Sequence, residues 1–246
     1  MDRKYAKSPI KEALCEFQFV PNQPWDMTVA GLFYEKIKEE FPIKKQQVGY
    51  QFGFQPKEDG IEQKVEKFQR MQFFNSDSSA LVQVGVDLLT INHLKPYSKW
   101  ENFKSMIIEN LKKYQELATP KGFKRIGLRY INKIGFSENS IEIKDYFNYY
   151  PSTPDDLPQM HDTFHVRVEI PYKQGRDHLI ITLTNVIPEI PDRISLILDL
   201  DYIIEKPEIT TGNQTSDWIA DAHIEIKKAF EACITDKCRN LFDEVI

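Results

Sequence analysis

The chain has 246 residues, of which 41% are hydrophobic and 12% aromatic, a composition that supports a packed interior and excludes a disordered protein. Its 37 acidic and 32 basic residues give a formal net charge of -5, which argues against a protein that wraps nucleic acid or coats an anionic membrane. Residues 1–14 lack the apolar run of a signal peptide and no apolar stretch could cross a bilayer, so we expect a cytoplasmic protein.

The first half of the chain is predicted to form five strands and two helices. Strand-like alternation, bounded by turn-forming residues, covers residues 12–20, 48–55, 68–75, 80–86 and 88–94. Asp26 is placed to cap a helix that runs to about Phe41, just before Pro42. The short turns between successive strands imply antiparallel pairing.

A long amphipathic helix is predicted to begin at Ser98. Ser98 and Glu101 have the spacing of a capping box, in which each side chain bonds a free backbone N–H group. Apolar residues then recur at steps of three and four, which makes one buried stripe: Trp100, Phe103, Ile107, Leu111 and Tyr114. Pro120 and Gly122 end this helix.

The second half repeats this order of elements. Strands are predicted over residues 123–136, 163–172, 178–187 and 194–204, with a short helix at 144–150 and a final helix from about 216 to 242. Residues 151–160 include three prolines and form a loop. The final helix opens with Ser216-Asp217-Trp218, which matches Ser98-Lys99-Trp100 at an offset of 118 residues.

Together these elements predict an α+β fold. The sheet is antiparallel and built from two β-α-β(n)-α halves, residues 1–120 and 121–246, with long amphipathic helices packed on one face. This arrangement resembles a helix-grip fold, and two tandem copies resemble the duplication of TATA-binding-protein-like folds. We expect the two halves to share one compact unit.

The three cysteines, Cys15, Cys233 and Cys238, show no metal-type spacing and are predicted to be reduced. His165 on one strand, His178 on the next and the pair Asp199 and Asp201 on a third are predicted to point away from the apolar core. If these strands are neighbours, the four side chains form a weak candidate for a catalytic or metal-assisted site. The alternative is a solvent-facing sheet surface with cross-strand ion pairs, and it is favoured because no tight metal-binding motif is present.

Arg125 and Arg129 lie on the basic side of the strand at 123–136, and Asn132 lies on its apolar side. Arg129 has the geometry to hold a phosphate or a carboxylate, but pairing with Asp199, Asp201 or Glu16 is favoured. Asn132 must be hydrogen-bonded if buried, as a core residue or as a ligand contact, and the core role is favoured. His223 is predicted to be a core residue. No metal or cofactor is predicted.

Three segments resemble a sporadically distributed, uncharacterised prokaryotic protein family: residues 9–19 (PIKEALCEFQF), 127–132 (GLRYIN) and 198–201 (LDLD). The resemblance covers nearly the whole chain, and GLRYIN is its most specific part. It implies patchy occurrence in bacteria and archaea, which often goes with defence or toxin-type loci. It implies no activity and no ligand.

These observations lead to two functional hypotheses. The first is a non-enzymatic binding or protein-interaction module that has a protein partner or a second copy of itself, and the resemblance is compatible with a component of a prokaryotic defence or toxin-type system. The alternative is a metal-assisted hydrolase or nuclease that uses Asp199, Asp201, His165 and His178. Nucleic-acid binding through Arg125 and Arg129 is least favoured because the chain is acidic, and no small-molecule ligand is identified.

Overall fold

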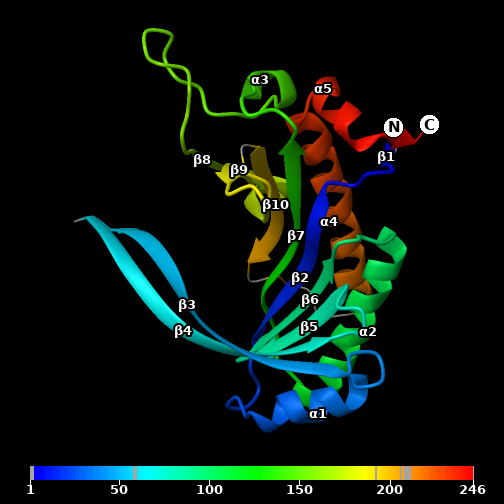
Figure 1. The fold of residues 1–246 in the computed structure, drawn as a ribbon. Helices are drawn as coiled ribbons and strands as arrows, with labels where there is room; N and C mark the ends of the chain where they lie inside the picture. Colours follow the sequence, from blue (N-terminus) through cyan, green and yellow to red (C-terminus); the bar gives the residue numbers. More distant parts are fainter. Residues whose placement is uncertain (1–2, 58–59, 192, 206, 208–211, 246) are drawn as a thin grey trace.

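Nine antiparallel strands form one continuous sheet in the computed structural model, which describes residues 3–57, 60–191, 193–205, 207 and 212–245 (Figure 1). From edge to edge the strand order is β3-β4-β5-β6-β2-β7-β10-β9-β8. Their bounds are β2 Ile10–Val20, β3 Ile43–Lys57, β4 Gly60–Phe74, β5 Ala80–Gly85, β6 Leu88–Leu94, β7 Gly122–Phe136, β8 His165–Tyr172, β9 Asp177–Val186 and β10 Ile194–Glu205. A second, two-stranded sheet pairs β1 (Lys4–Tyr5) with β11 (Glu244–Val245).

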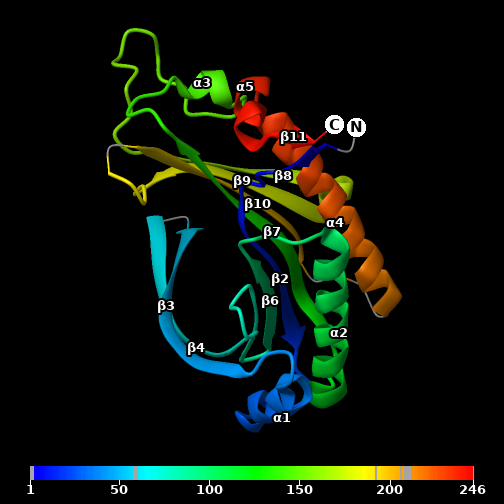
Figure 2. The same cartoon turned by 45° about the vertical axis from the view of Figure 1, so that its right-hand side comes forward.

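Three helices lie on one face of the large sheet (Figure 2). They are α1 (Thr28–Ile37), α2 (Trp100–Ala118) and α4 (Gly212–Cys233). Helix α2 contacts β6, α4 contacts β7 and β10, and α1 packs beside α2. The short helices α3 (Ile143–Tyr146) and α5 (Asp236–Arg239) contact each other near the β1–β11 pair. No described helix covers the opposite face, which we call the helix-free face.

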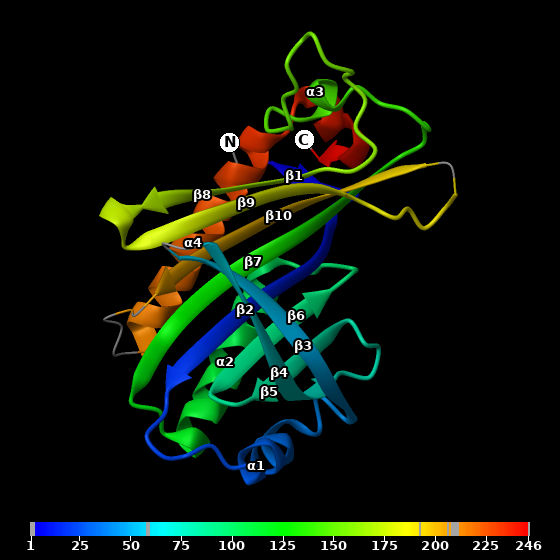
Figure 3. The ribbon, with the colours of Figure 1, turned by 90° about the vertical axis from the view of Figure 1, so that its left-hand side faces the viewer.

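The long β3–β4 ribbon extends beyond its neighbours and curves toward the helix-free face (Figures 2 and 3). All six residues of β5 and the first six of β6 are buried. Both faces of these two strands are therefore shielded from water, although described helices lie on only one of them.

The core lies between the sheet and its three helices. Alternate residues of β2 are buried because their side chains point toward the helices, and they include Cys15 and Phe17 at 0% exposure. Helix α2 contributes Phe103 and Ile107, also fully buried, at the spacing of one helical face. The buried residues of both chain halves belong to one continuous cluster.

The predicted fold class is wrong. The structure is dominated by a single nine-stranded antiparallel sheet, with 41% of residues in strands and 29% in helices, and not by two β-α-β(n)-α halves in a helix-grip or TATA-binding-protein-like duplication. The physical reason is the pairing of β2 with β7, which runs from Ile10–Asn132 to Val20–Gly122 and merges the strands of both halves. That pairing joins segments more than 100 residues apart, and local alternation carries no information about it.

The repeated Ser-x-Trp motif does not mark equivalent positions. Trp100 stacks on His223 of the other long helix, with ring centroids 4.0 Å apart and planes at 4°. Trp218 is 5% exposed and packs against Tyr202 of the sheet, with centroids 5.8 Å apart. Ser98 does not cap α2 either, because its hydroxyl bonds His93 Nε2 at 2.8 Å and α2 has no side-chain cap.

Most strand positions agree with the predicted ones, but two helices end early. Helix α1 ends at Ile37 and not near Phe41, and α4 ends at Cys233 and not at Phe242. Thr235 stops α4 because its hydroxyl accepts a hydrogen bond from Cys238 N at 3.3 Å and so caps the new helix α5. Cys15, Cys233 and Cys238 are free and buried. In the described part of the chain, every helix is too short or too polar to span a membrane.

Candidate functional site

The helix-free face carries a network of ion pairs that crosses the central strands. Arg125 of β7 donates to Glu16 of β2 at 3.3 Å and to Asp201 of β10 at 3.0 Å. Arg70 of β4 approaches the same Glu16 at 3.9 Å. The register explains this convergence, because Glu16 faces Gly127 across one side of β7 while Asp201 faces Arg129 across the other. One guanidinium therefore bridges carboxylates from the two strands that flank β7.

A second ion pair on this face joins Arg129 and Asp199. The guanidinium donates from Nε to both carboxylate oxygens, at 2.8 and 3.1 Å, and also from Nη2 to Oδ2. This bidentate hydrogen bonding raises the pKa of Arg129 above its ordinary value. The Asp199 side chain is only 13% exposed, whereas that of Arg129 is 41% exposed. Asp199 therefore fixes the orientation of a cation that water can still reach.

Side-chain amides continue the network toward the other edge of the sheet. Gln72 donates to Gln47 at 2.9 Å and to Gln83 at 3.0 Å, and Gln83 donates to Asn92 at 2.9 Å. Asn92 then donates to Glu12 of β2 at 2.5 Å. Gln83 and Asn92 are 8% and 2% exposed, so each needs the partners it has. The chain of bonds crosses five strands, from β3 to β2.

Burial changes the acidity of one member of this network. It raises the pKa of Asp201 from 3.8 to about 6, although Arg125 and Arg129 act to lower it. The carboxylate still faces Arg125, and its neighbour Asp199 is held by Arg129. This face therefore presents ion-paired charged groups and hydrogen-bond donors that are held in fixed positions.

The predicted Asp/His cluster does not assemble. His165 and His178 lie at opposite ends of the β8–β9 hairpin, because His165 faces Thr184 and His178 faces Pro171. His178 contacts Glu169 at 3.1 Å and the carbonyl of Gly175 at 3.2 Å, away from both aspartates. Among the described residues, no group of three or more histidine, cysteine, aspartate or glutamate side chains has metal-binding geometry.

The three predicted ligand-binding residues separate onto two faces. Arg125 and Arg129 lie on the helix-free face in the ion pairs described above. Asn132 lies on the helix-covered side, is 2% exposed, and donates to the carbonyl of Leu198 at 3.1 Å. It bridges β7 to β10 inside the core.

A separate polar cluster lies under the start of α2. His223 of α4 stacks on Trp100, and its Nδ1 lies 3.0 Å from the hydroxyl of Tyr130, which lies 3.0 Å from that of Tyr97. Burial lowers the pKa of His223 from 6.5 to about 4, so the ring is neutral near pH 7. His223 is half-buried, and its stacking on Trp100 links the two long helices.

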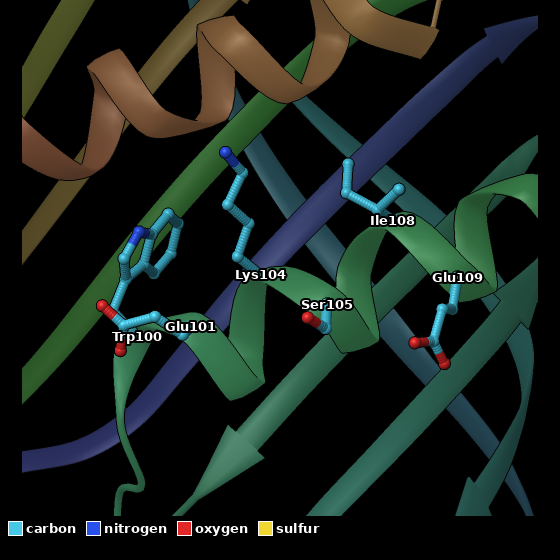
Figure 4. Close-up of a pocket in the computed structure, with 6 residues that line it drawn as sticks. All are labelled: Trp100, Glu101, Lys104, Ser105, Ile108 and Glu109. Carbon is cyan, nitrogen blue, oxygen red and sulfur yellow. The ribbon is translucent and has the colours of Figure 1, made fainter.

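The outer surface of α2 has a hollow of about 510 Å³ (Figure 4). Trp100 and Lys104 point from it toward α4, and the rest of its lining is Glu101, Ser105, Ile108 and Glu109. All six residues come from one helix and none of them is buried. This hollow lacks the convergent polar groups from several elements that the helix-free face has, so it is the weaker candidate for a binding site.

Apart from Glu16, sequence reasoning missed the residues that the first half contributes to the network. Gln83, Thr90 and Asn92 are polar residues at alternate positions of otherwise apolar strands, and Glu12 also alternates with apolar neighbours. The same alternation had placed Asp199 and Asp201 on a polar face. Applied to the first half, the same alternation would have placed these residues on one face of the sheet. It would not have shown that they contact one another.

A search against models of protein families and a search of curated proteins both gave no match to this chain.

Proposed function

We propose that this protein is a non-enzymatic binding module that holds a polypeptide partner on the helix-free face of its sheet. The observation that carries this proposal is the network of ion pairs on β2, β7 and β10, in which the Arg129 side chain is 41% exposed, while the buried amides of β5 and β6 hold the adjoining part of the sheet in place. Its donors and acceptors are fixed before any ligand arrives, which lowers the entropy lost on binding.

The composition of this face supports a polypeptide over a polyanion. Four carboxylates lie among four cations, so phosphates would meet as much repulsion as attraction: Glu12, Glu16, Asp199 and Asp201 against Arg70, Arg125, Arg129 and Lys133. Half-buried Leu14, Ile131 and Ile197 lie between the charged side chains. A mixed apolar and polar surface of this kind is typical of protein interfaces.

Arg129 is the residue through which we expect the partner to be recognised. Asp199 occupies Nε and Nη2, and the contacts of the described residues leave Nη1 without a hydrogen bond. A half-exposed guanidinium with a fixed plane can donate to a backbone carbonyl or a carboxylate of the partner with little loss of side-chain entropy. Catalysis by Asp199 or Asp201 is not favoured, because both carboxylates already bind arginines.

The test is affinity purification from the native lysate with quantitative mass spectrometry of the captured proteins. The Arg129→Glu variant places like charges together at the centre of the face, and it should lose a specific partner at least about tenfold. Lys124→Glu is the matched control, since Lys124 is exposed on the same strand next to the bulge near Gln18 and lies outside the network.

Ile131→Lys serves as a second variant, because it changes the helix-free face and leaves both members of the Arg129–Asp199 ion pair in place. Circular dichroism confirms that each variant is folded before capture. Loss of the same partner in both face variants and its retention in Lys124→Glu support the proposal. Identical capture by the wild type and all variants would exclude this face as the binding surface.

A further inference from the structure

The last strand of the sheet, β8, has an open edge with an unusual run of exposed residues. Among the described strands, β8 pairs only with β9. Residues 167–171 are all exposed, and Val168 and Ile170 are each 38% exposed. Open edges with apolar side chains are places where a further strand can add. The question is which strand fits this edge.

Symmetry restricts how two copies of β8 can pair. If two copies pair antiparallel through β8, they are related by a two-fold axis perpendicular to the joined sheet. Directly opposite residues have their side chains on the same face, so the axis must pass beside the same residue of each copy. An axis at Arg167 or at Glu169 would place two like charges directly opposite each other. An axis at Val168 places Arg167 of each copy opposite Glu169 of the other. The order Arg-Val-Glu is therefore self-complementary at one register.

The helix-covered side of β8 agrees with the same register. With the axis at Val168, the two Val168 side chains meet and Val166 lies opposite Ile170 of the second copy. These are the apolar side chains of the strand, and pairing would remove them from water. Helix α4 comes close to the end of β8, because Lys173 just after the strand contacts Asp221 of the helix at 3.6 Å. Ile224, one helical turn further along α4, is 49% exposed.

Pro171 indicates which backbone groups of β8 face the open edge, and it gives no N–H to His165 of the second copy. Proline has no N–H group, so it fits an edge strand where that group would point away from the neighbouring strand. The backbone groups of residue 171 then point away from β9 toward the open edge, as do those of 167 and 169, whereas those of 168 point toward β9. In the Val168 register, Arg167 and Glu169 of the second copy can therefore exchange both backbone hydrogen bonds, and Val168 faces itself at a non-hydrogen-bonded position.

We propose that this protein forms a homodimer by antiparallel pairing of its β8 strands about an axis at Val168. The two sheets then join into one, and both helix-free faces lie on the same side of it. The occupant of this edge is a second copy of the chain, since the charge order of β8 is complementary to itself.

Disulfide trapping tests the register directly. Directly opposite residues at a non-hydrogen-bonded position have Cα atoms about 4.5 Å apart, within the range that a disulfide spans. The native cysteines are buried, so Val168→Cys should give a covalent dimer on mild oxidation. Val86→Cys is the control, because Val86 is 63% exposed in the turn between β5 and β6. Equal cross-linking of the two variants, or none in Val168→Cys, would overturn the register.

Charge exchange tests the pairing without a covalent bond, by analytical ultracentrifugation over micromolar concentrations. Arg167→Glu alone and Glu169→Arg alone each create like-charge pairs across the axis and should weaken dimerisation about tenfold. The double variant restores opposite charges and should dimerise like the wild type. A monomeric wild type, or a double variant as weak as the single ones, would refute the proposal.

Discussion

Two partly buried ionisable side chains, Asp201 and His223, have pKa values displaced in opposite directions. Burial favours the neutral form of each group, which raises the pKa of an acid and lowers that of a base. Protonation then has opposite effects on stability, because it restores the favoured form of Asp201 and removes that of His223. In the wild type the two effects overlap in mildly acidic solution and partly cancel. Single variants are therefore needed to separate them.

His223 should make stability increase with pH between about 4 and 6.5. In this window the unfolded chain binds a proton at the imidazole while the folded chain, with its pKa of about 4, does not. The difference corresponds to about 3 kcal/mol of unfolding free energy. His223→Phe keeps a ring against Trp100 and should remove this dependence. Urea unfolding at several pH values measures it, and parallel curves for the two proteins would contradict the assignment.

Asp201 should have the opposite effect. Its folded pKa of about 6 exceeds the ordinary 3.8, so between these values the folded state binds more protons than the unfolded state and becomes more stable as the pH falls. Asp201→Asn cannot titrate, and Arg125 keeps Glu16 as a partner. From pH 7 to 4, the wild type should gain about 2 kcal/mol relative to this variant. No change in that difference would show that the carboxylate is not destabilised by burial.

At the level of elements, the strands could be predicted from the sequence, but the ends of the helices could not. Alternation identifies a strand because burial of one face is a local property of β structure. A cap depends on which other group outside the helix competes for the same hydroxyl. Ser98 bonds His93 of β6 in place of its own helix, and the end of α4 is set by Thr235 together with contacts from α5.

The junction of α4 and α5 predicts a specific loss of stability. Glu231 of α4 accepts hydrogen bonds from Tyr5 of β1 at 2.7 Å and from Arg239 of α5 at 2.9 Å. Glu231→Ala leaves both donors without this acceptor, so we expect a loss of about 1–3 kcal/mol. Glu225→Ala on the same helix removes only a surface pair with Lys228 and should be nearly neutral. Thermal unfolding measures the stability of both variants, and equal losses would show that Glu231 does not hold α4, α5 and β1 together.

At the level of the whole molecule, the repeated order of elements predicted a fold of two halves, whereas the strand pairing joins all nine strands into one sheet. Local patterns describe each strand alone and do not show that β2 and β7 are neighbours. The same limit applies to the candidate site. The pair of Arg129 with Asp199 was among the alternatives, since their strands are close in the second half. The bridge from Arg125 to Glu16 depends on β2 and β7 lying side by side.

This continuity predicts that the chain unfolds as one unit. Strand β2 pairs with β6 of its own half and with β7 of the other, and the buried cluster includes residues from both halves. Calorimetry should therefore show a single transition whose calorimetric and van't Hoff enthalpies agree. Fragments 1–120 and 121–246 should each be unfolded when made alone, because separation exposes the backbone and the apolar faces of β2 and β7. Mixing them should restore the circular dichroism spectrum of the intact chain. Two separate transitions, or a fragment that folds alone, would show that the halves are independent domains.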